Sequence, residues 1–202
     1  MAKSSTGKQT GWQRALTQAG IDAAAEALEL EGWTVLPTEE VPYSDNVDLH
    51  IIDGDREAQV SVTTTNRYGW VSGGAASDSV RDGAPIINRA APPHAQADFA
   101  VLATPAHPVA KREMPEEWRF FIVPEADAES AFRHIVDSVI NRPRADGSRR
   151  EARGFIMAFV GPDDGDDTKP GPGADDLADQ SARFSPFESA FDQLTRIRPP
   201  KY

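Results

Sequence analysis

The feature that most constrains the fold of this 202-residue chain is a pair of alternating segments joined by Asp53-Gly54. Residues 47–52 and 56–62 each alternate apolar with polar side chains, which is the period of a strand with one buried face. Asp-Gly between two such runs is a strong signal for a tight hairpin. We therefore predict an antiparallel β-hairpin over residues 47–62.

The hairpin prediction also assigns each side chain to one of two faces. With Asp53-Gly54 as the loop, Ile52 pairs with Asp55, and Asp48 lies opposite Gln59. The apolar face, which we expect to be buried, holds Val47, Leu49, Ile51, Ala58, Val60 and Val62. The other face is polar and holds Asp48, His50, Glu57, Gln59, Ser61 and Thr63. A row of such side chains on neighbouring strands is a candidate functional site.

A helix and a short strand precede the hairpin. Apolar residues recur at helical spacing from Trp12 onward, at Leu16, Ile21, Ala24, Ala25 and Leu28. Gly32 can adopt the left-handed conformation that ends helices, so we expect the helix to stop there. Residues 33–36 then read as a strand that Pro37 closes.

The remainder of the chain predicts further strands and helices around the same core. Strands are expected at 98–103, 119–123 and 154–160, and helices at 125–140 and 184–194. Residues 66–95 are rich in Gly, Ser, Ala and Pro and predict loops with at most a short strand or helix. The expected fold is a single α/β domain, with a central mixed sheet of about five strands flanked by helices.

Composition divides the chain into four parts. We expect a disordered tail over residues 1–11, the α/β domain over 12–160, a mobile acidic loop rich in Pro and Gly over 161–183, and a carboxy-terminal helix and tail over 184–202. This last segment should pack over a sheet edge through Phe184, Phe187, Phe191 and Leu194.

Charge and cysteine content limit the classes of function. The net charge of −11 argues against broad, non-specific binding of nucleic acid, although it permits binding through a local basic patch. The candidate patch is Arg142, Arg144, Arg149, Arg150 and Arg153, which could equally pair with the acidic loop. The chain has no cysteine, no signal-like apolar segment and no membrane-length apolar run, so we expect a cytoplasmic protein without a membrane partner.

Three motifs in a fixed order carry a resemblance to a known family. They are Gly32-Trp33-Thr34-Val35 after the first helix, Asp48-Leu49 on the first hairpin strand, and Gln59-Val60-Ser61 on the second. This order resembles the PD-(D/E)XK, or restriction-endonuclease-like, nuclease superfamily, and most of all its small prokaryotic members similar to Holliday-junction resolvases. The resemblance covers roughly residues 15–125 and implies a restriction-endonuclease-like core.

The resemblance implies a metal site on the polar face. In the family, an Asp and a Glu or Gln hold Mg²⁺, and a lysine two residues further along positions the attacking water. The matching metal ligands here are Asp48 and Gln59, completed by an acid of the first helix, Glu26 or Asp22. Ser61 stands where the family has its lysine, and a serine supplies no positive charge.

An alternative register uses Glu57 as the acid and Gln59 in place of the lysine. The catalytic candidates are therefore Asp48, Glu57, Gln59 and Ser61, with Mg²⁺ as cofactor only if the site is active.

Three functions follow from this reading. The first is a PD-(D/E)XK-fold protein with impaired catalysis, which acts as a nucleic-acid-associated or regulatory binding protein. The second is an active Mg²⁺-dependent DNA endonuclease. The third is an acidic protein-interaction module of the inhibitor or immunity type. The implied partners are DNA or a protein, and the oligomeric state stays open, a dimer included.

Overall fold

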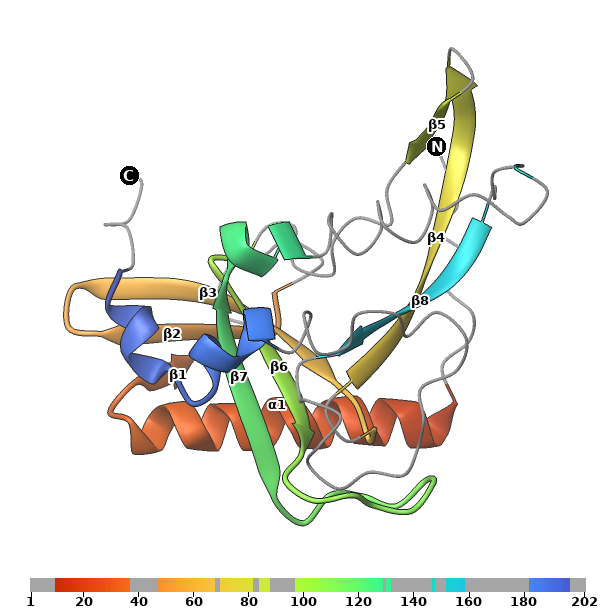
Figure 1. Cartoon of the computed structure of the whole chain (residues 1–202). Coiled ribbons are helices and arrows are strands. Elements are labelled where there is room, and N and C mark those ends of the chain that lie inside the picture. The colour runs from red at the N-terminus through yellow and green to blue at the C-terminus, as the bar shows by residue number, and fades with distance from the viewer. Residues whose placement is uncertain are drawn as a thin grey trace.

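The structure is a computed structural model that describes residues 10–36, 47–67, 70–81, 84–87, 97–128, 130, 131, 147, 152–158 and 182–196. It is an α/β domain in which a helix, α1 (Gly11–Leu30), lies across a five-stranded mixed sheet, as predicted (Figure 1). The strands of this sheet are β1 (Thr34–Leu36), β2 (Leu49–Asp53), β3 (Arg56–Thr64), β6 (Phe99–Pro105) and β7 (Trp118–Pro124). In the described part of the chain, no helix has the length and apolar character needed to cross a membrane.

Both ends of α1 are fixed by local hydrogen bonds. Thr10 caps the first turn, because its Oγ1 accepts from the N–H of Gln13 while the Gln13 side chain accepts from the N–H of Thr10. At the other end Gly32 has a φ of +93°, and the N–H of Trp33 donates to the carbonyl of Leu28. This is the Schellman arrangement. The prediction that the helix stops at Gly32 is confirmed.

The strand order is β1-β2-β3-β6-β7. Strands β1, β2 and β3 form an antiparallel meander, β3 and β6 are parallel, and β6 and β7 are antiparallel. Parallel neighbours need a crossover connection, and here residues 65–98 provide it. The helix-strand-hairpin order that the resemblance implies is therefore present.

The hairpin exists, but its register differs by two residues from the predicted one. Asp53 pairs with Arg56, so the loop is Gly54-Asp55. Gly54 occupies the first loop position with a φ of +63°, as glycine does in type II′ hairpin turns. The prediction that Asp48 lies opposite Gln59 is wrong, because Gln59 pairs with His50. A shift of two residues keeps the side chains of the paired residues 49–53 and 56–60 on their expected faces.

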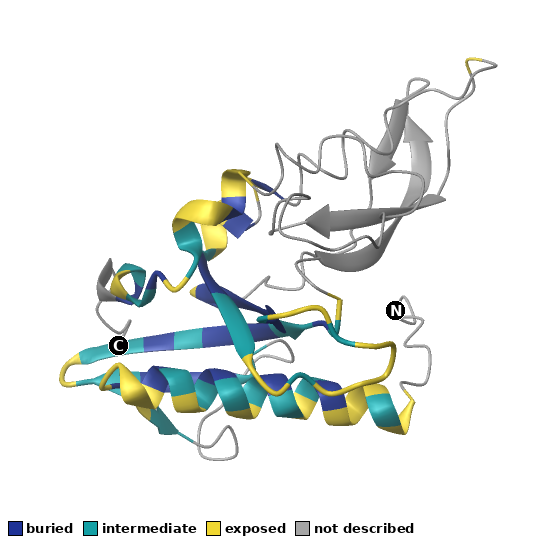
Figure 2. Cartoon of the chain, turned by 60° about the horizontal axis from the view of Figure 1, so that its bottom comes forward, coloured by how far each residue is buried: buried dark blue, intermediate teal, exposed yellow. Residues whose placement is uncertain are grey.

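The apolar face of the hairpin joins the core beneath α1. The core cluster contains Ala24, Leu28, Trp33, Leu49, Ile51, Ala58, Val60, Val62, Phe99, Val101, Ala103, Ile122 and Leu194. Figure 2 shows α1 against this side of the sheet, with its exposed residues turned away. Helix and sheet approach each other closely at Gly20, where an added β-carbon would overlap Cγ2 of Thr64 and lie 3.4 Å from the Trp118 ring.

The other face of the sheet is covered as well. Leu102, Phe121 and Val123 alternate with the core residues of their strands and are fully buried. Helical turns at residues 125–128 and 130–131 follow β7, which agrees with the start of the predicted helix; its remainder lies outside the described residues. His50 and Ser61 on the polar face of the hairpin are only 2% and 3% exposed.

A second, three-stranded sheet has the order β5-β4-β8. It consists of β4 (Trp70–Arg81), β5 (Ala84–Ile87) and β8 (Ala152–Ala158). The prediction of loops over 66–95 is wrong, because β4 is a 12-residue strand. Its small residues disfavour a strand when considered alone, but Trp70 to Ala76 pair continuously with β8, and this pairing prevails over propensity. The predicted strand at 154–160 corresponds to β8.

The carboxy-terminal segment packs against the edge strand β7. Its helix is broken, which corrects the prediction of one helix over 184–194: two 3₁₀ segments, η2 (Ser185–Phe187) and η3 (Phe191–Arg196), flank an isolated bridge between Glu188 and Phe121. The break spans residues 188–190 and includes Ser189, whose φ is +49°. Packing over a sheet edge is confirmed, with Phe184 and Leu194 buried and Phe187 and Phe191 half-buried.

Candidate functional site

Asp48 lies at the point where the chain enters β2. Its Oδ2 accepts a 2.6 Å hydrogen bond from the N–H of Val62, and its own N–H donates to the carbonyl of Val60 at 2.9 Å. The carboxylate is therefore bound to the backbone of β3. Asp48 lies just before the paired part of β2, whose register with β3 begins at Leu49–Val60.

A pocket of about 430 Å³ opens between α1 and the start of β2 and contains the Asp48 side chain. It is lined by Gln18, Ile21, Asp22, Ala25, Glu29, Val35, Leu36, Val47, Asp48 and Leu49. Gln18 and Asp22 are joined by a 2.8 Å hydrogen bond between the Gln18 amide and the Asp22 carboxylate. The pocket is thus acidic, with carboxylates from both the helix and the strand.

Of the two helix acids considered from the sequence, the structure brings Asp22 to the pocket of Asp48. Residues 18, 22, 25 and 29 recur at intervals of three and four and form one stripe along α1. Glu26 is exposed one step further around the helix and is not among the lining residues. Glu29 was not proposed from the sequence, although its spacing from Asp22 is the signal that places both on the stripe.

Burial gives Asp48 its electrostatic character. Desolvation raises the pKa of the Asp48 carboxyl, and the hydrogen bond from Val62 partly opposes this by favouring the charged form. The carboxylate is therefore less favourable in the folded protein than in the unfolded chain. Above the pH at which Asp48 ionises, the pocket holds a partly desolvated negative charge.

The other hairpin candidates lie at different distances from Asp48. Gln59 pairs with His50, two positions along β2 from Asp48. Glu57 pairs with Ile52, four positions along, which at the usual rise separates its backbone from that of Asp48 by about 13 Å. Glu57 is therefore the more distant of the two from Asp48.

Glu57 instead interacts with a buried histidine. The His50 Nε2 lies 2.8 Å from Glu57 Oε1, and the Glu57 side chain is 41% exposed. His50 lies on the polar face of the hairpin, and its burial is explained by the covered second face of the sheet. The pair links β2 to β3 on the polar face of the hairpin, away from the pocket that Asp48 lines.

Asp98 is a residue whose role the sequence did not suggest. Its Oδ2 accepts from the N–H of Gln59 at 2.9 Å, and its own N–H donates to the carbonyl of Gln59 at 2.8 Å. This reciprocal pair fixes the start of β6 to β3. Because it depends on a parallel contact between distant segments, no local sequence signal could have revealed it.

Two further expectations concern metal and nucleic acid. Within the described residues, no three His, Asp or Glu side chains form a group that could hold a metal ion. Arg142, Arg144, Arg149 and Arg150 lie outside the described residues, and Arg153 is placed only by the pairing of its backbone with Ala75 in β4. The metal ligands and the arginine patch stay predictions.

The raised pKa of Asp48 makes a testable prediction about stability. In the pH range between the ordinary carboxyl value of 3.8 and its folded-state value, the folded protein holds more protons at Asp48 than the unfolded chain does. The contribution of Asp48 to the free energy of unfolding is therefore full below this range and is lost as the pH rises through it. Asp48→Asn should remove this contribution, which urea denaturation at a series of pH values would measure.

Two comparison variants complete that experiment. Asp55→Asn changes an exposed carboxyl in the hairpin loop and should leave the loss of stability in place. Asp48→Ala also deletes the acceptor for the Val62 N–H, which should cost about 1–3 kcal/mol at any pH. An Asp48→Asn protein with an unchanged pH profile would contradict the assignment to Asp48.

Comparisons with known proteins identify no family for this chain. No protein-family model matches the chain, and no curated protein matches it. Among solved structures, the chain is similar to that of a bacterial homing endonuclease, I-Ssp6803I, with a TM-score of 0.44 and 16% sequence identity over 91% of this chain and 93% of the other. Any assignment of function must therefore come from the residues of this chain.

Proposed function

We propose that this chain is a PD-(D/E)XK-like protein that binds nucleic acid without cleaving it efficiently. The order of its elements supports the kinship: a helix that ends at Gly32, an antiparallel meander with an aspartate entering its second strand, and a parallel fourth strand. The motifs of the sequence resemblance lie at corresponding places in this order.

The observation that carries the loss of efficient cleavage is the neutral strand next to Asp48. Gln59, Ser61 and Thr63 alternate along β3, and none of them is charged. Ser61, two positions after the Gln59 that matches the family's metal-ligand position, therefore supplies no positive charge. Losing a catalytic charge or donor of this kind costs on the order of 10²–10³ in rate.

Asp48 also has a structural role that does not need a metal. Its carboxylate accepts the N–H of Val62 and so holds the entry of β2 against β3. Binding to nucleic acid would use the arginines of residues 142–153. The net charge of −11 disfavours contact with phosphates over most of the surface, so a local basic segment must make these contacts.

The experiment measures binding and cleavage on the same DNA. The chain is expected to bind labelled branched or linear DNA at low salt and to leave plasmid and branched substrates uncut in the presence of Mg²⁺. Replacing Arg142, Arg144, Arg149 and Arg150 with alanine should weaken binding and reduce its salt dependence, because fewer counterions are released. Arg14→Ala on α1 is the matched single-charge control. Cleavage by the wild type that Asp48→Ala abolishes would establish the active-nuclease alternative instead.

A second candidate function is favoured by the acidic pocket. Asp22, Glu29 and Asp48 line one cavity in a chain with a net charge of −11, as suits a module that binds a basic protein. For such a module, a basic partner would be retained by the wild type and lost on combining Asp22→Asn with Glu29→Gln. A protein-interaction module would also not bind DNA at low salt, and this result distinguishes the second function from the first.

A further inference from the structure

The outer strand of the five-stranded sheet carries a strongly apolar segment. β7 is the last strand in the order β1-β2-β3-β6-β7, and it contains Phe120-Phe121-Ile122-Val123. Its outward N–H and C=O groups are not used by β6, and such an edge is a template for another strand. An uncharged run of aromatic and β-branched residues is also the composition that favours association between strands. This edge needs a cover.

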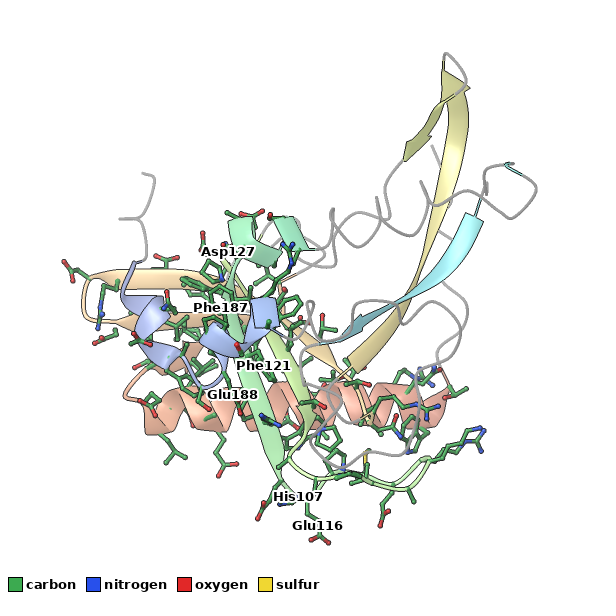
Figure 3. All side chains as sticks on the ribbon, in the orientation of Figure 1. His107, Glu116, Phe121, Asp127, Phe187 and Glu188 are labelled. Carbon is green, nitrogen blue, oxygen red and sulfur yellow. The ribbon has the colours of Figure 1, made fainter. Side chains whose placement is uncertain are left out.

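Residues 182–194 provide that cover, and we call them the strap. The strap pairs with β7 through a single bridge, Phe121 with Glu188, and the N–H of Ser189 donates to the carbonyl of Phe120 at 2.9 Å. Phe184 and Leu194 anchor its two ends as buried side chains. Figure 3 shows Phe187 and Glu188 beside Phe121 on this edge. With so short a ladder, the strap depends on its side chains.

The polar anchor of the strap is an ion pair between Arg119 and Glu188. Nε of Arg119 lies 2.5 Å from Oε1 of Glu188, and Nη2 lies 2.9 Å from Oε2, so the pair is bidentate. The guanidinium also lies 5.8 Å from the centre of the Phe121 ring. Both side chains are about one third exposed or less, at 25% for Arg119 and 35% for Glu188. Charge-assisted bonds of this kind are stronger than neutral ones.

We propose that the strap is a releasable cover, and that its release lets β7 pair antiparallel with β7 of a second copy of the chain. The sequence of β7 suits this occupant. Pairing symmetric about Phe121 places Arg119 opposite Val123 and Phe120 opposite Ile122, so no like charges face each other. Pro124 lacks an N–H and ends the ladder on both sides. This inference does not depend on the proposed function.

The test weakens the anchor in the full-length chain. Glu188→Lys replaces the ion pair with two like charges, and the amide of Ser189 should then exchange its hydrogen on the order of tenfold to a hundredfold faster. Light scattering after gel filtration should show a dimer whose fraction rises with protein concentration. The combination Arg119→Glu with Glu188→Arg restores opposite charges and should return both readouts toward the wild type.

Controls separate release from unfolding. Asp127→Lys makes the same change of charge at an exposed position near the end of β7 and should leave the chain monomeric. The amide of Thr65, which donates to Ala103 inside the sheet, reports whether the sheet stays folded. If Thr65 also exchanges faster, the same measurements are made on Glu188→Gln, which removes the negative charge without placing a positive charge beside Arg119. A Glu188→Lys protein that remains monomeric overturns the proposal, and so does a dimer with Ser189 still protected, because the strap would then be exchanged between copies.

Discussion

Replacing Leu28 with alanine is expected to lower the free energy of unfolding by about 2–5 kcal/mol. Leu28 is 1% exposed, and it lies in the core cluster beneath α1 together with Trp33. Its carbonyl also accepts a hydrogen bond from the N–H of Trp33 in the Schellman arrangement. Leu28 therefore lies both in the core and in the turn that ends the helix. Truncation there leaves a cavity that the neighbouring strands cannot fill without moving.

Leu30→Ala is the matched control for that measurement. Leu30 is in the same last turn of α1 but is 83% exposed, so the same chemical change should alter stability by less than about 0.5 kcal/mol. Urea denaturation of both variants, compared at equal m-values, measures the difference. Equal losses at the two positions would show that burial against the sheet does not account for the effect.

Replacing Gly20 with alanine is expected to destabilise the fold by about 1–3 kcal/mol, although alanine is the better helix former. The new methyl group would overlap Cγ2 of Thr64 and lie 3.0 Å from its β-carbon. Thr64 is β-branched, so its side chain has few other rotamers to adopt. To relieve the overlap, α1 would have to move away from β3.

The chain offers a direct rescue and a control for Gly20. Thr64→Ser deletes Cγ2 and keeps the hydroxyl, so it should recover most of the loss when combined with Gly20→Ala. A double-mutant cycle then gives the coupling between the two sites. Gly11→Ala, with no atom within 4 Å of the added carbon, should be close to neutral. Additive effects of the two substitutions would contradict a clash between them.

The local features of the fold could be read from the sequence because their signals are local. Gly32 ends α1 as expected, and the two faces of the hairpin separate as the alternation indicates. The register was not determined by the sequence, because Asp53-Gly54-Asp55 offers glycine either the second or the first loop position. Only the backbone geometry of Gly54 distinguishes the two.

Features that depend on distant partners could not be predicted. Nothing within residues 70–81 indicates a strand until β8 is available to pair with it. The candidate site shows the same limit. Which helix acid meets Asp48 depends on how α1 is rotated against the sheet, and that rotation depends on packing between the helix and distant strands. The reciprocal bonds of Asp98 and Gln59 likewise require β6 to be in place.

The path of the chain through its two sheets has a consequence for how the protein assembles. β4 and β6 precede the loop over residues 106–117, whereas their partners β8 and β7 follow it. Figure 3 shows this loop, marked by His107 and Glu116, at the far end of the β6–β7 hairpin. A nick there would give two fragments, each missing strands from both sheets. Neither fragment could complete one sheet by itself, so complementation between the halves would rebuild both sheets together or neither.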